Sequence, residues 1–185
     1  MLYIKDKEFK RIVKDILRNK EFKKLYNIEH HGISRYEHLV KIAYYSFIIA
    51  KRLKIDYKSV ARGGLLHDFY LDGDERSATK KFIDTFIHPK KALMTSKNIF
   101  NLNKMEENII ISHMFPIYPV LPRYKESILV NLVDKVLGFK EMVLEYHYKF
   151  RYRFNYMYIL FFMIMLNKWP APTTLEVWEF FWVFS

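Results

Sequence analysis

A histidine and an aspartate stand side by side at the end of an apolar, glycine-containing run, and this pair constrains the chain more than any other feature. His67 and Asp68 belong to the segment GGLLHDF, residues 63–69. Burying an imidazole beside a carboxylate is costly unless both groups are paired. A divalent metal pairs with both groups at once. The run therefore indicates a buried metal site.

Further imidazole and carboxylate residues stand where they can complete such a site, at the ends or on the apolar faces of expected helices. The candidate metal ligands are His38, His67, Asp68, His88, His113 and Asp134. The chain has no cysteine, which excludes thiolate ligands, disulfides and a cysteine nucleophile. Imidazole and carboxylate ligands suit iron, manganese, zinc or nickel, so we expect one or two divalent metal ions per chain.

The order of four of these residues resembles that of the HD-domain metal-dependent phosphohydrolase superfamily: His38, His67, Asp68 and Asp134. The residues around them agree with the resemblance, because RYEH opens a long amphipathic segment and the last aspartate lies in LVNLVDKV. The resemblance covers residues 30–145 and implies an all-α HD-domain helical bundle. It also implies an enzyme that hydrolyses a phosphate ester or phosphoanhydride, with a nucleotide as the expected substrate, by a metal-activated water.

Two further histidines decide between one metal and two. His88 and His113 fall between the HD pair and the last aspartate, where two-metal members of the superfamily carry extra histidines. This layout is most similar to that of the HD-type enzymes that split symmetric dinucleoside tetraphosphates, and it implies a second metal with Asp68 as a bridge. Taken singly, His88 is more simply a helix cap and His113 a core or surface residue. Together and in this order, they favour the two-metal arrangement.

Catalytic and substrate-binding roles follow from the same resemblance and from side-chain chemistry. The expected catalytic residues are Asp68, His67 and Arg35. The candidates for substrate binding are His30, His31, Arg35 and Asp72. A guanidinium matches phosphate oxygens in a two-point contact, and a histidine can move a proton. The simpler readings stay open: a surface salt bridge for Arg35, a polar loop for the histidine pair, and a solvated carboxylate for Asp72.

Apolar residues recur at helical spacing over most of the chain. The expected helices are a basic amphipathic helix within residues 5–24 that packs on the core, a helix from 35 to 53, one that Asp56 caps, one that starts at His88-Pro89, and helices over 105–114 and 125–143. The glycine pair at 63 and 64 suggests that another backbone comes close to its helix. Asp72 to Glu75 is expected to be a loop, and three prolines between 116 and 122 a stiff connector.

Charge and length set the remaining bounds. The net charge is +11, which suggests an anionic partner or a lysine-rich solvated surface. We expect a phosphohydrolase domain over residues 1–145, including the N-terminal helix, and an aromatic, hydrophobic extension over 146–185. The first 25 residues lack an apolar signal-peptide region, which favours a cytoplasmic protein.

The C-terminal quarter carries two competing patterns. Aromatic residues alternate from 146 to 158, which is typical of a strand, and an uncharged run follows from 156 to 166. An isolated strand in an all-α domain would leave its backbone groups unpaired, so we expect residues 139–166 to be mainly helical. We expect this helix to pack against the core or a second subunit, with the uncharged run 156–166 buried in protein or facing a membrane. Core packing, a homodimer interface and attachment to a membrane surface through 146–166 stay open.

The aromatic, basic C-terminus also carries the alternative function, from a different class. In that interpretation the chain is a catalytically weak, metal-stabilised binding module that acts at a membrane surface or on nucleic acid. Interleaved basic and aromatic residues suit single-stranded nucleic acid. The chain has no recognised stacking module, however, and a nucleic-acid partner is therefore disfavoured.

Overall fold

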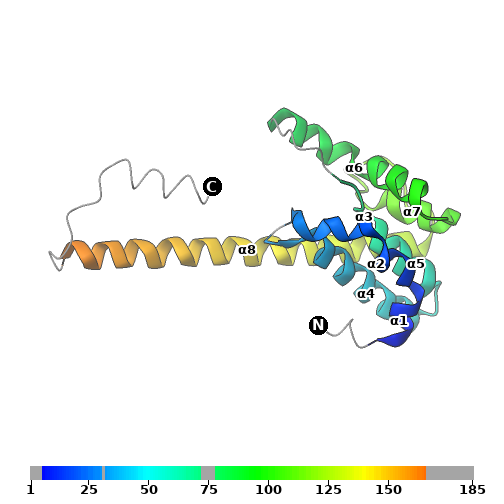
Figure 1. The fold of residues 1–185 in the computed structure, drawn as a ribbon, viewed down its shortest axis with the longest axis horizontal. Helices are drawn as coiled ribbons and strands as arrows, with labels where there is room; N and C mark the ends of the chain where they lie inside the picture. The colour runs from blue at the N-terminus through cyan, green and yellow to red at the C-terminus, as the bar shows by residue number, and fades with distance from the viewer. Residues whose placement is uncertain (1–5, 31, 72–77, 166–185) are drawn as a thin grey trace. The chain divides into compact units, whose positions relative to one another are not determined.

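The computed structural model describes residues 6–30, 32–71 and 78–165, except the side chains of 29, 30, 78–85 and 162–165 (Figure 1). Its helices are α1 (Lys7–Ile12), α2 (Lys14–Arg18), α3 (Lys20–Lys23), α4 (Arg35–Leu53), α5 (Tyr57–Leu66), α6 (Ala78–Ile99), α7 (Lys104–Ser112) and α8 (Lys125–Met165). A 3-10 turn, η2 (Lys24–Asn27), precedes the two-residue antiparallel strands β1 (Glu29–His30) and β2 (Ile33–Ser34). The predicted all-α class is confirmed.

The chain forms two compact units, Met1–Met142 and Val143–Ser185. The first unit contains α1 to α7 and the first part of α8, and it includes every candidate metal ligand. The second contains the rest of α8. The expected division of function between 1–145 and 146–185 stays a prediction.

The N-terminal segment packs on the core as expected, but the prediction of one long helix there is wrong. Asn19 has an extended backbone, with φ −65° and ψ 134°, and separates α2 from α3. Its side chain accepts hydrogen bonds from the backbone N–H groups of Glu21 and Phe22. Asn19 is therefore the N-cap of a new helix, α3, and interrupts the expected continuous one. Val13 and Ile16 are fully buried in the core.

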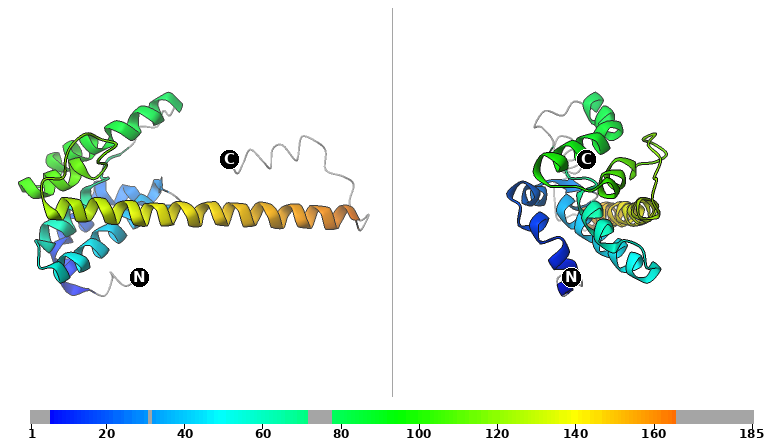
Figure 2. Two further views of the ribbon diagram at one scale, coloured as in Figure 1. Left: turned by 180° about the vertical axis from the view of Figure 1, so that it is seen from behind. Right: turned by 90° about the vertical axis from the view of Figure 1, so that its right-hand side faces the viewer.

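Helices α4 and α5 pack directly against each other (Figure 2). His38 lies in α4, and His67 and Asp68 directly follow α5. Asp56 caps α5 as predicted, accepting from the backbone N–H of Ser59. A Cβ atom on Gly64 would lie 3.2 Å from Cα of Ala43 in α4, which confirms the expected close approach of a second backbone. Gly63 faces α7, where a Cβ atom would lie 2.9 Å from Ile109.

Helix α6 corrects a second prediction. It runs from Ala78 to Ile99, so His88 and Pro89 lie inside a helix and not at its start. A proline inside a helix lacks the N–H that would bond one turn back, at a cost of about 3 kcal/mol. Ala92 and Ser96 of α6 are fully buried, so tertiary packing holds the helix together across the proline. His88 is thereby placed within the helix, where its side chain is buried.

Helix α7 begins at a capping box of Asn103 and Glu106 and ends one residue before His113. The connector with its three prolines follows as predicted, and α8 then runs unbroken from Lys125 to Met165. The expected helix over 125–143 is therefore confirmed, as is the helical interpretation of 139–166 up to Met165. The residues with alternating aromatics, 146–158, are helical and not a strand.

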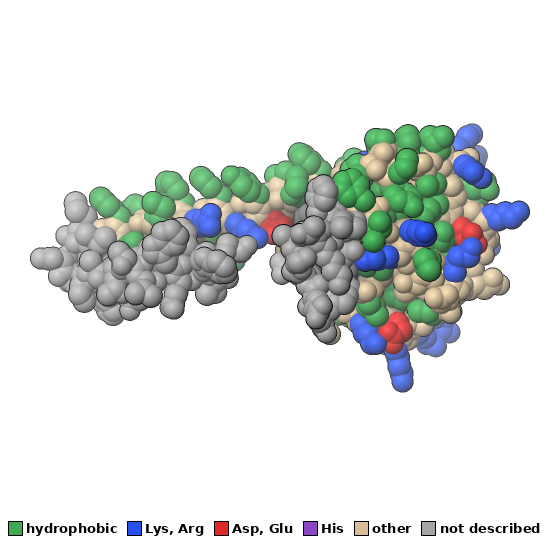
Figure 3. All heavy atoms as spheres, turned by 90° about the horizontal axis from the view of Figure 1, so that it is seen from above, with side chains coloured by type: hydrophobic (Ala, Val, Ile, Leu, Met, Phe, Trp, Pro, Cys, Tyr) green, Lys and Arg blue, Asp and Glu red, His purple; other side chains and the backbone are tan. Residues whose placement is uncertain are grey.

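Within the second unit, the described side chains of 143–161 are largely exposed, and their expected packing against the core, a second subunit or a membrane stays a prediction. Tyr146 is 74 % exposed, Phe150 57 % and Phe154 64 %, and Figure 3 shows hydrophobic side chains along the surface of α8. Among the described residues, no helix combines the length and apolar character needed to cross a membrane. The aromatic stretch from 177 to 184 lies outside the described residues.

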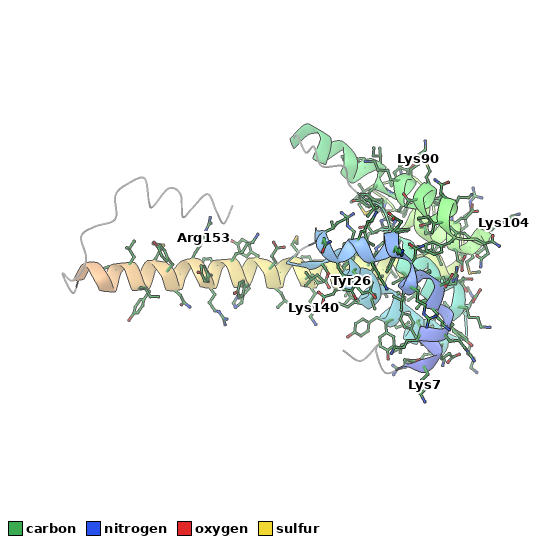
Figure 4. The ribbon with its side chains drawn as sticks, viewed as in Figure 1. Lys7, Tyr26, Lys90, Lys104, Lys140 and Arg153 are labelled. Carbon is green, nitrogen blue, oxygen red and sulfur yellow. The ribbon has the colours of Figure 1, made fainter. Side chains whose placement is uncertain are left out.

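Basic side chains stand on the outer surfaces of the described helices. Figure 4 labels five that are exposed: Lys7, Lys90, Lys104, Lys140 and Arg153. They come from α1, α6, α7 and α8 and do not share one element. Part of the positive charge of the chain is therefore carried by ordinary solvent-exposed side chains.

Candidate metal centre

The first group of candidate ligands is His38, His67 and Asp134. His38 lies on α4, His67 directly follows the last residue of α5, and Asp134 lies on α8. Both histidines direct Nε2 at the same carboxylate oxygen: the distance from Oδ1 of Asp134 is 3.2 Å to His38 and 3.4 Å to His67. Both imidazoles are 1 % exposed. Three helices thus bring two imidazoles and one carboxylate together inside the first unit.

The second group is Asp68, His88 and His113, and all three residues are buried. Oδ1 of Asp68 lies 3.3 Å from Nε2 of His88 and 3.7 Å from Nε2 of His113. The two Nε2 atoms are 3.0 Å apart. The rings of His67 and His113 are 4.9 Å apart between centroids, so the two groups adjoin. The consecutive residues His67 and Asp68 therefore supply one ligand to each group.

The spacing of these atoms fits a metal ion in each group. Ligand atoms bound to zinc at about 2.0–2.1 Å in tetrahedral geometry lie about 3.3 Å from one another. In each group, the three candidate ligand atoms lie within 4.8 Å of one another. Oδ1 of Asp68 is also buried and, within the described part of the chain, has no hydrogen-bond partner. A buried carboxylate oxygen without a donor is stabilised by a cation, so the residues present suit a divalent metal.

Hydrogen bonds at the far side of the rings direct the lone pairs inward. Nδ1 of His67 lies 2.7 Å from the carbonyl oxygen of Gly64, and Nδ1 of His113 lies 2.7 Å from that of Ile110. A carbonyl oxygen only accepts, so Nδ1 carries the proton in both rings and Nε2 of a neutral ring keeps its lone pair. Metal-binding histidines usually have such a partner on the second nitrogen. Both rings are therefore oriented as ligands.

The surroundings of the first group favour the charged forms of its side chains. Burial alone would lower the pKa of His38, but hydrogen bonds to Asp134 and Glu141 outweigh burial and raise it to about 9. Burial would raise the pKa of Asp134, yet the neighbouring charge of His67 and the hydrogen bond from His38 hold it well below its usual value. Without a metal, protons on the imidazoles balance the carboxylate. A metal ion would replace those protons on binding.

The second group keeps one neutral imidazole. Burial lowers the pKa of His113 to about 4, and the nearby charge of His67 acts in the same direction. Burial would raise the pKa of Asp68, but the charges of His88 and His67 outweigh it and hold the pKa well below its usual range. At neutral pH this group thus combines an ionised carboxylate with a neutral imidazole, which is the protonation state that a metal requires.

The structure brings the six candidate ligands together as two adjoining groups of three. That His38, His67, Asp68 and Asp134 share one metal ion stays a prediction. Asp68 falls into the group with His88 and His113. Side chains of consecutive residues at a helix end leave in different directions, and helix periodicity does not reveal which neighbour each will meet. A bridging role of Asp68 stays a prediction.

Of the predicted substrate-binding residues, Arg35 is the one whose side chain the structure describes. Arg35 is 6 % exposed, its Nη1 donates to the carbonyl oxygen of Tyr70 at 3.0 Å, and its guanidinium lies 4.2 Å from the centre of the Tyr70 ring. His31, Asp72 and the side chain of His30 lie outside the described residues.

Sequence reasoning missed two residues that support the centre. Glu141 accepts a hydrogen bond from His38 Nδ1 at 2.7 Å. It stands seven residues after Asp134, two helical turns along the same face, and this spacing could have identified it. Asn131 donates from Nδ2 to the carbonyl oxygens of His113 and Phe115 and so fixes the end of α7. Nothing in its sequence context indicated that contact.

The comparisons add no relative to this picture. No family model matches the chain, and neither a curated protein nor a solved structure does. The geometry of the centre and the order of its residues are therefore the only guides to function.

Proposed function

We propose that the chain is an HD-type metal-dependent phosphohydrolase that cleaves a phosphate ester or phosphoanhydride, with a nucleotide as its expected substrate. One observation carries the proposal: two adjoining buried groups, each of two imidazoles and one carboxylate, in the order of the HD signature. A structural metal needs only one closed site. Two adjacent sites with three protein ligands each leave positions for water and substrate, as catalytic sites do.

The residues of the chain have distinct tasks in this proposal. His67 and Asp68 hold neighbouring positions and set the distance between them. A divalent metal bound there would act as a Lewis acid, lowering the pKa of a water molecule and stabilising charge on the phosphoryl group. The carbonyl oxygens of Gly64 and Ile110 keep His67 and His113 oriented through their Nδ1 protons.

Arg35 is proposed to orient the substrate phosphate. Its charge lies close enough to help lower the pKa of Asp68, after the larger effects of burial and of three histidines. The ring of Tyr70 stacks on that of His88 at 5.8 Å and also contacts the guanidinium, so one aromatic side chain holds both groups in place. A positioned guanidinium binds phosphate oxygens with less loss of entropy than a mobile one.

The test is turnover by the purified full chain. A panel of phosphate esters and nucleotides, including dinucleoside tetraphosphates, is assayed with manganese, iron, nickel, zinc and magnesium. We expect metal-dependent hydrolysis of at least one compound, and its loss in Asp68→Ala. Asp15→Ala is the matched control, because Asp15 is a half-exposed carboxylate paired with Arg62 away from the centre. Absence of turnover with every metal would contradict the proposal.

One observation favours the alternative, a metal-stabilised binding module. The described side chains of 143–161 expose large apolar groups, and Lys149, Arg151 and Arg153 stand among them. Apolar and basic side chains on one helix suit an anionic membrane surface. Sedimentation with vesicles containing an anionic lipid tests this directly. Metal binding and vesicle binding without turnover would favour the module over the enzyme.

A further inference from the structure

The two groups of ligands differ in the hydrogen-bond partners of their histidine Nδ1 atoms. Among the three histidines whose Nδ1 partner the structure identifies, His67 and His113 are bonded to backbone carbonyl oxygens. His38 is bonded to a carboxylate, with Oε2 of Glu141 at 2.7 Å. The first group thus has a second negative charge beside it in addition to Asp134. No such carboxylate is found behind the second group in the described part of the chain.

Glu141 is held in place for this contact. Its side chain is 9 % exposed, and its other oxygen, Oε1, lies 3.2 Å from Nζ of Lys41. Lys41 lies on α4, three residues after His38, and Glu141 lies on α8 with Asp134. The lysine therefore occupies one oxygen and leaves the other for the imidazole.

A carboxylate behind a metal-binding imidazole has two effects. It fixes the tautomer and the ring orientation, and it makes Nε2 a stronger electron donor. A bond to a neutral carbonyl oxygen gives the orientation with less of the second effect. Charge-assisted hydrogen bonds are also roughly twice as strong as neutral ones. Both effects strengthen metal binding by the deprotonated form of the group that contains His38, and the metal displaces the Nε2 proton of His38 as it binds.

We propose that Glu141 is a positioning residue that makes the site of His38, His67 and Asp134 the tighter of two metal sites, so that it fills first. The inference rests on the proposed metal centre. It assigns an order to the loading: the site supported by Glu141 keeps its metal when metal is scarce, and the site of Asp68, His88 and His113 fills only as metal becomes abundant. Occupancy of the second site would then set how much of the protein is active.

Calorimetric titration of the metal-free full chain with Co²⁺ tests the order, and the visible spectrum of bound cobalt identifies each step. Wild-type protein should show two steps of unequal affinity. Glu141→Gln should weaken the tighter step by roughly 10–100-fold and leave the weaker one nearly unchanged. Glu21→Gln is the control, because it makes the same chemical change in an exposed ion pair with Lys24.

A second variant distinguishes positioning of His38 by Glu141 from a general contact between α4 and α8. Lys41→Met also removes a contact between α4 and α8 but leaves the hydrogen bond between Glu141 and His38. It should not weaken the tighter step. Equal weakening in Lys41→Met and Glu141→Gln would mean that Glu141 only ties the helices together, and it would overturn the inference.

A third variant keeps the test valid if Glu141→Gln folds poorly. His88→Ala disrupts the second group and leaves Glu141 intact, so it should lose the weaker step and keep the tighter one. Loss of the tighter step in His88→Ala would overturn the inference. Two equal steps in the wild type would overturn it as well, while the proposed function would stand. If the wild type bound no cobalt, both would fail.

Discussion

The first unit buries polar side chains in its interior, whereas the described part of the second unit exposes large apolar ones. His38, His67 and His113 are each 1 % exposed, while Tyr146 is 74 % and Phe154 64 % exposed. Both arrangements run against the hydrophobic rule, and each is informative for that reason. Buried imidazoles and carboxylates need a compensating charge. Exposed aromatic side chains cost solvation free energy unless something covers them.

The two regions differ in what the chain itself supplies. In the first unit, hydrogen bonds behind His38, His67 and His113 orient imidazoles that could hold a cation. Over residues 143–161, large apolar side chains are exposed in the single chain. Substitutions in each region, and changes of pH, can break or sharpen this contrast.

Removing a buried carboxylate should have the largest effect. Asp134→Ala leaves His38 and His67 without their shared oxygen, so the first group loses its negative ligand. We expect turnover to fall by at least about 10³-fold, because metal binding and charge placement are lost together. Metal content, measured by elemental analysis, should fall by one ion per chain. Asp15→Ala should change neither quantity, and retention of full metal content by Asp134→Ala would contradict the assignment.

Two phenylalanines compare the regions directly. Phe47 is 1 % exposed in the core and Phe150 is 57 % exposed on α8. Phe47→Ala should lower the free energy of unfolding by about 3–5 kcal/mol, through lost burial and a cavity. Phe150→Ala should change it by less than about 0.5 kcal/mol, as exposed positions usually do. Urea denaturation at low protein concentration measures both. Comparable losses would show that Phe150 is covered in solution.

The stability of the metal-free first unit should depend on pH, with a maximum near 6.5. The pKa of His38 is raised from 6.5 to about 9, so its contribution is complete below pH 6.5 and disappears as the pH rises through 9. The pKa of His113 is lowered to about 4, so protonation of the unfolded chain removes stability as the pH falls from 6.5 to 4. The depressed pKa values of Asp68 and Asp134 add to the loss in acid.

The measurement is urea denaturation in the presence of a chelator across this pH range. We expect a loss of roughly 1–3 kcal/mol between pH 6.5 and 9, since one pKa unit corresponds to about 1.4 kcal/mol. Added Mn²⁺ should remove the alkaline loss, because the metal replaces the protons on the imidazoles. A flat profile from pH 6.5 to 9 without metal would contradict the raised pKa of His38.

The smallest expected difference between two variants concerns the glycine pair of α5. An added Cβ at Gly63 would lie 2.9 Å from Ile109, a branched side chain that is fully buried, whereas one at Gly64 would lie 3.2 Å from Cα of Ala43. Gly63→Ala should therefore destabilise by about 1–3 kcal/mol. Gly64→Ala should lower the free energy of unfolding less. The contact is milder there, and the higher helix propensity of alanine offsets its cost by about 1 kcal/mol. Thermal unfolding measures the order, and the reverse order would contradict it.

Much of the fold could be predicted from local chemistry. Asp56 is a good N-cap, and it caps α5; apolar spacing predicts α4 and the first part of α8, and both are found. Predictions failed where packing outweighed a local signal. Pro89 is typical of a first helical turn, yet α6 continues on both sides of it. The amphipathic N-terminal segment suggested one helix, yet Asn19 caps a new one.

The candidate site was predicted as a set of residues but not as an arrangement. Residue type and order were sufficient to select six candidate ligands that the structure brings together, because buried imidazole and carboxylate groups need partners. Their division into two groups could not be read from the order, since His67 and Asp68 are neighbours in sequence and belong to different groups. Glu141 was missed because its role depends on contact with His38, which lies 103 residues earlier in the chain.

The sequence by itself determined the helical class, the buried polar pair and the types of ligand available to a metal, because these depend on side-chain chemistry and on the period of the helix. Only the tertiary structure decided which candidate ligands lie together and which carboxylate is hydrogen-bonded to Nδ1 of His38. It also decided that the aromatic side chains of α8 face outward over 143–161 in the single chain. The physical reason is that contacts between distant segments depend on how helices pack, and periodicity within one helix carries no information about its neighbours.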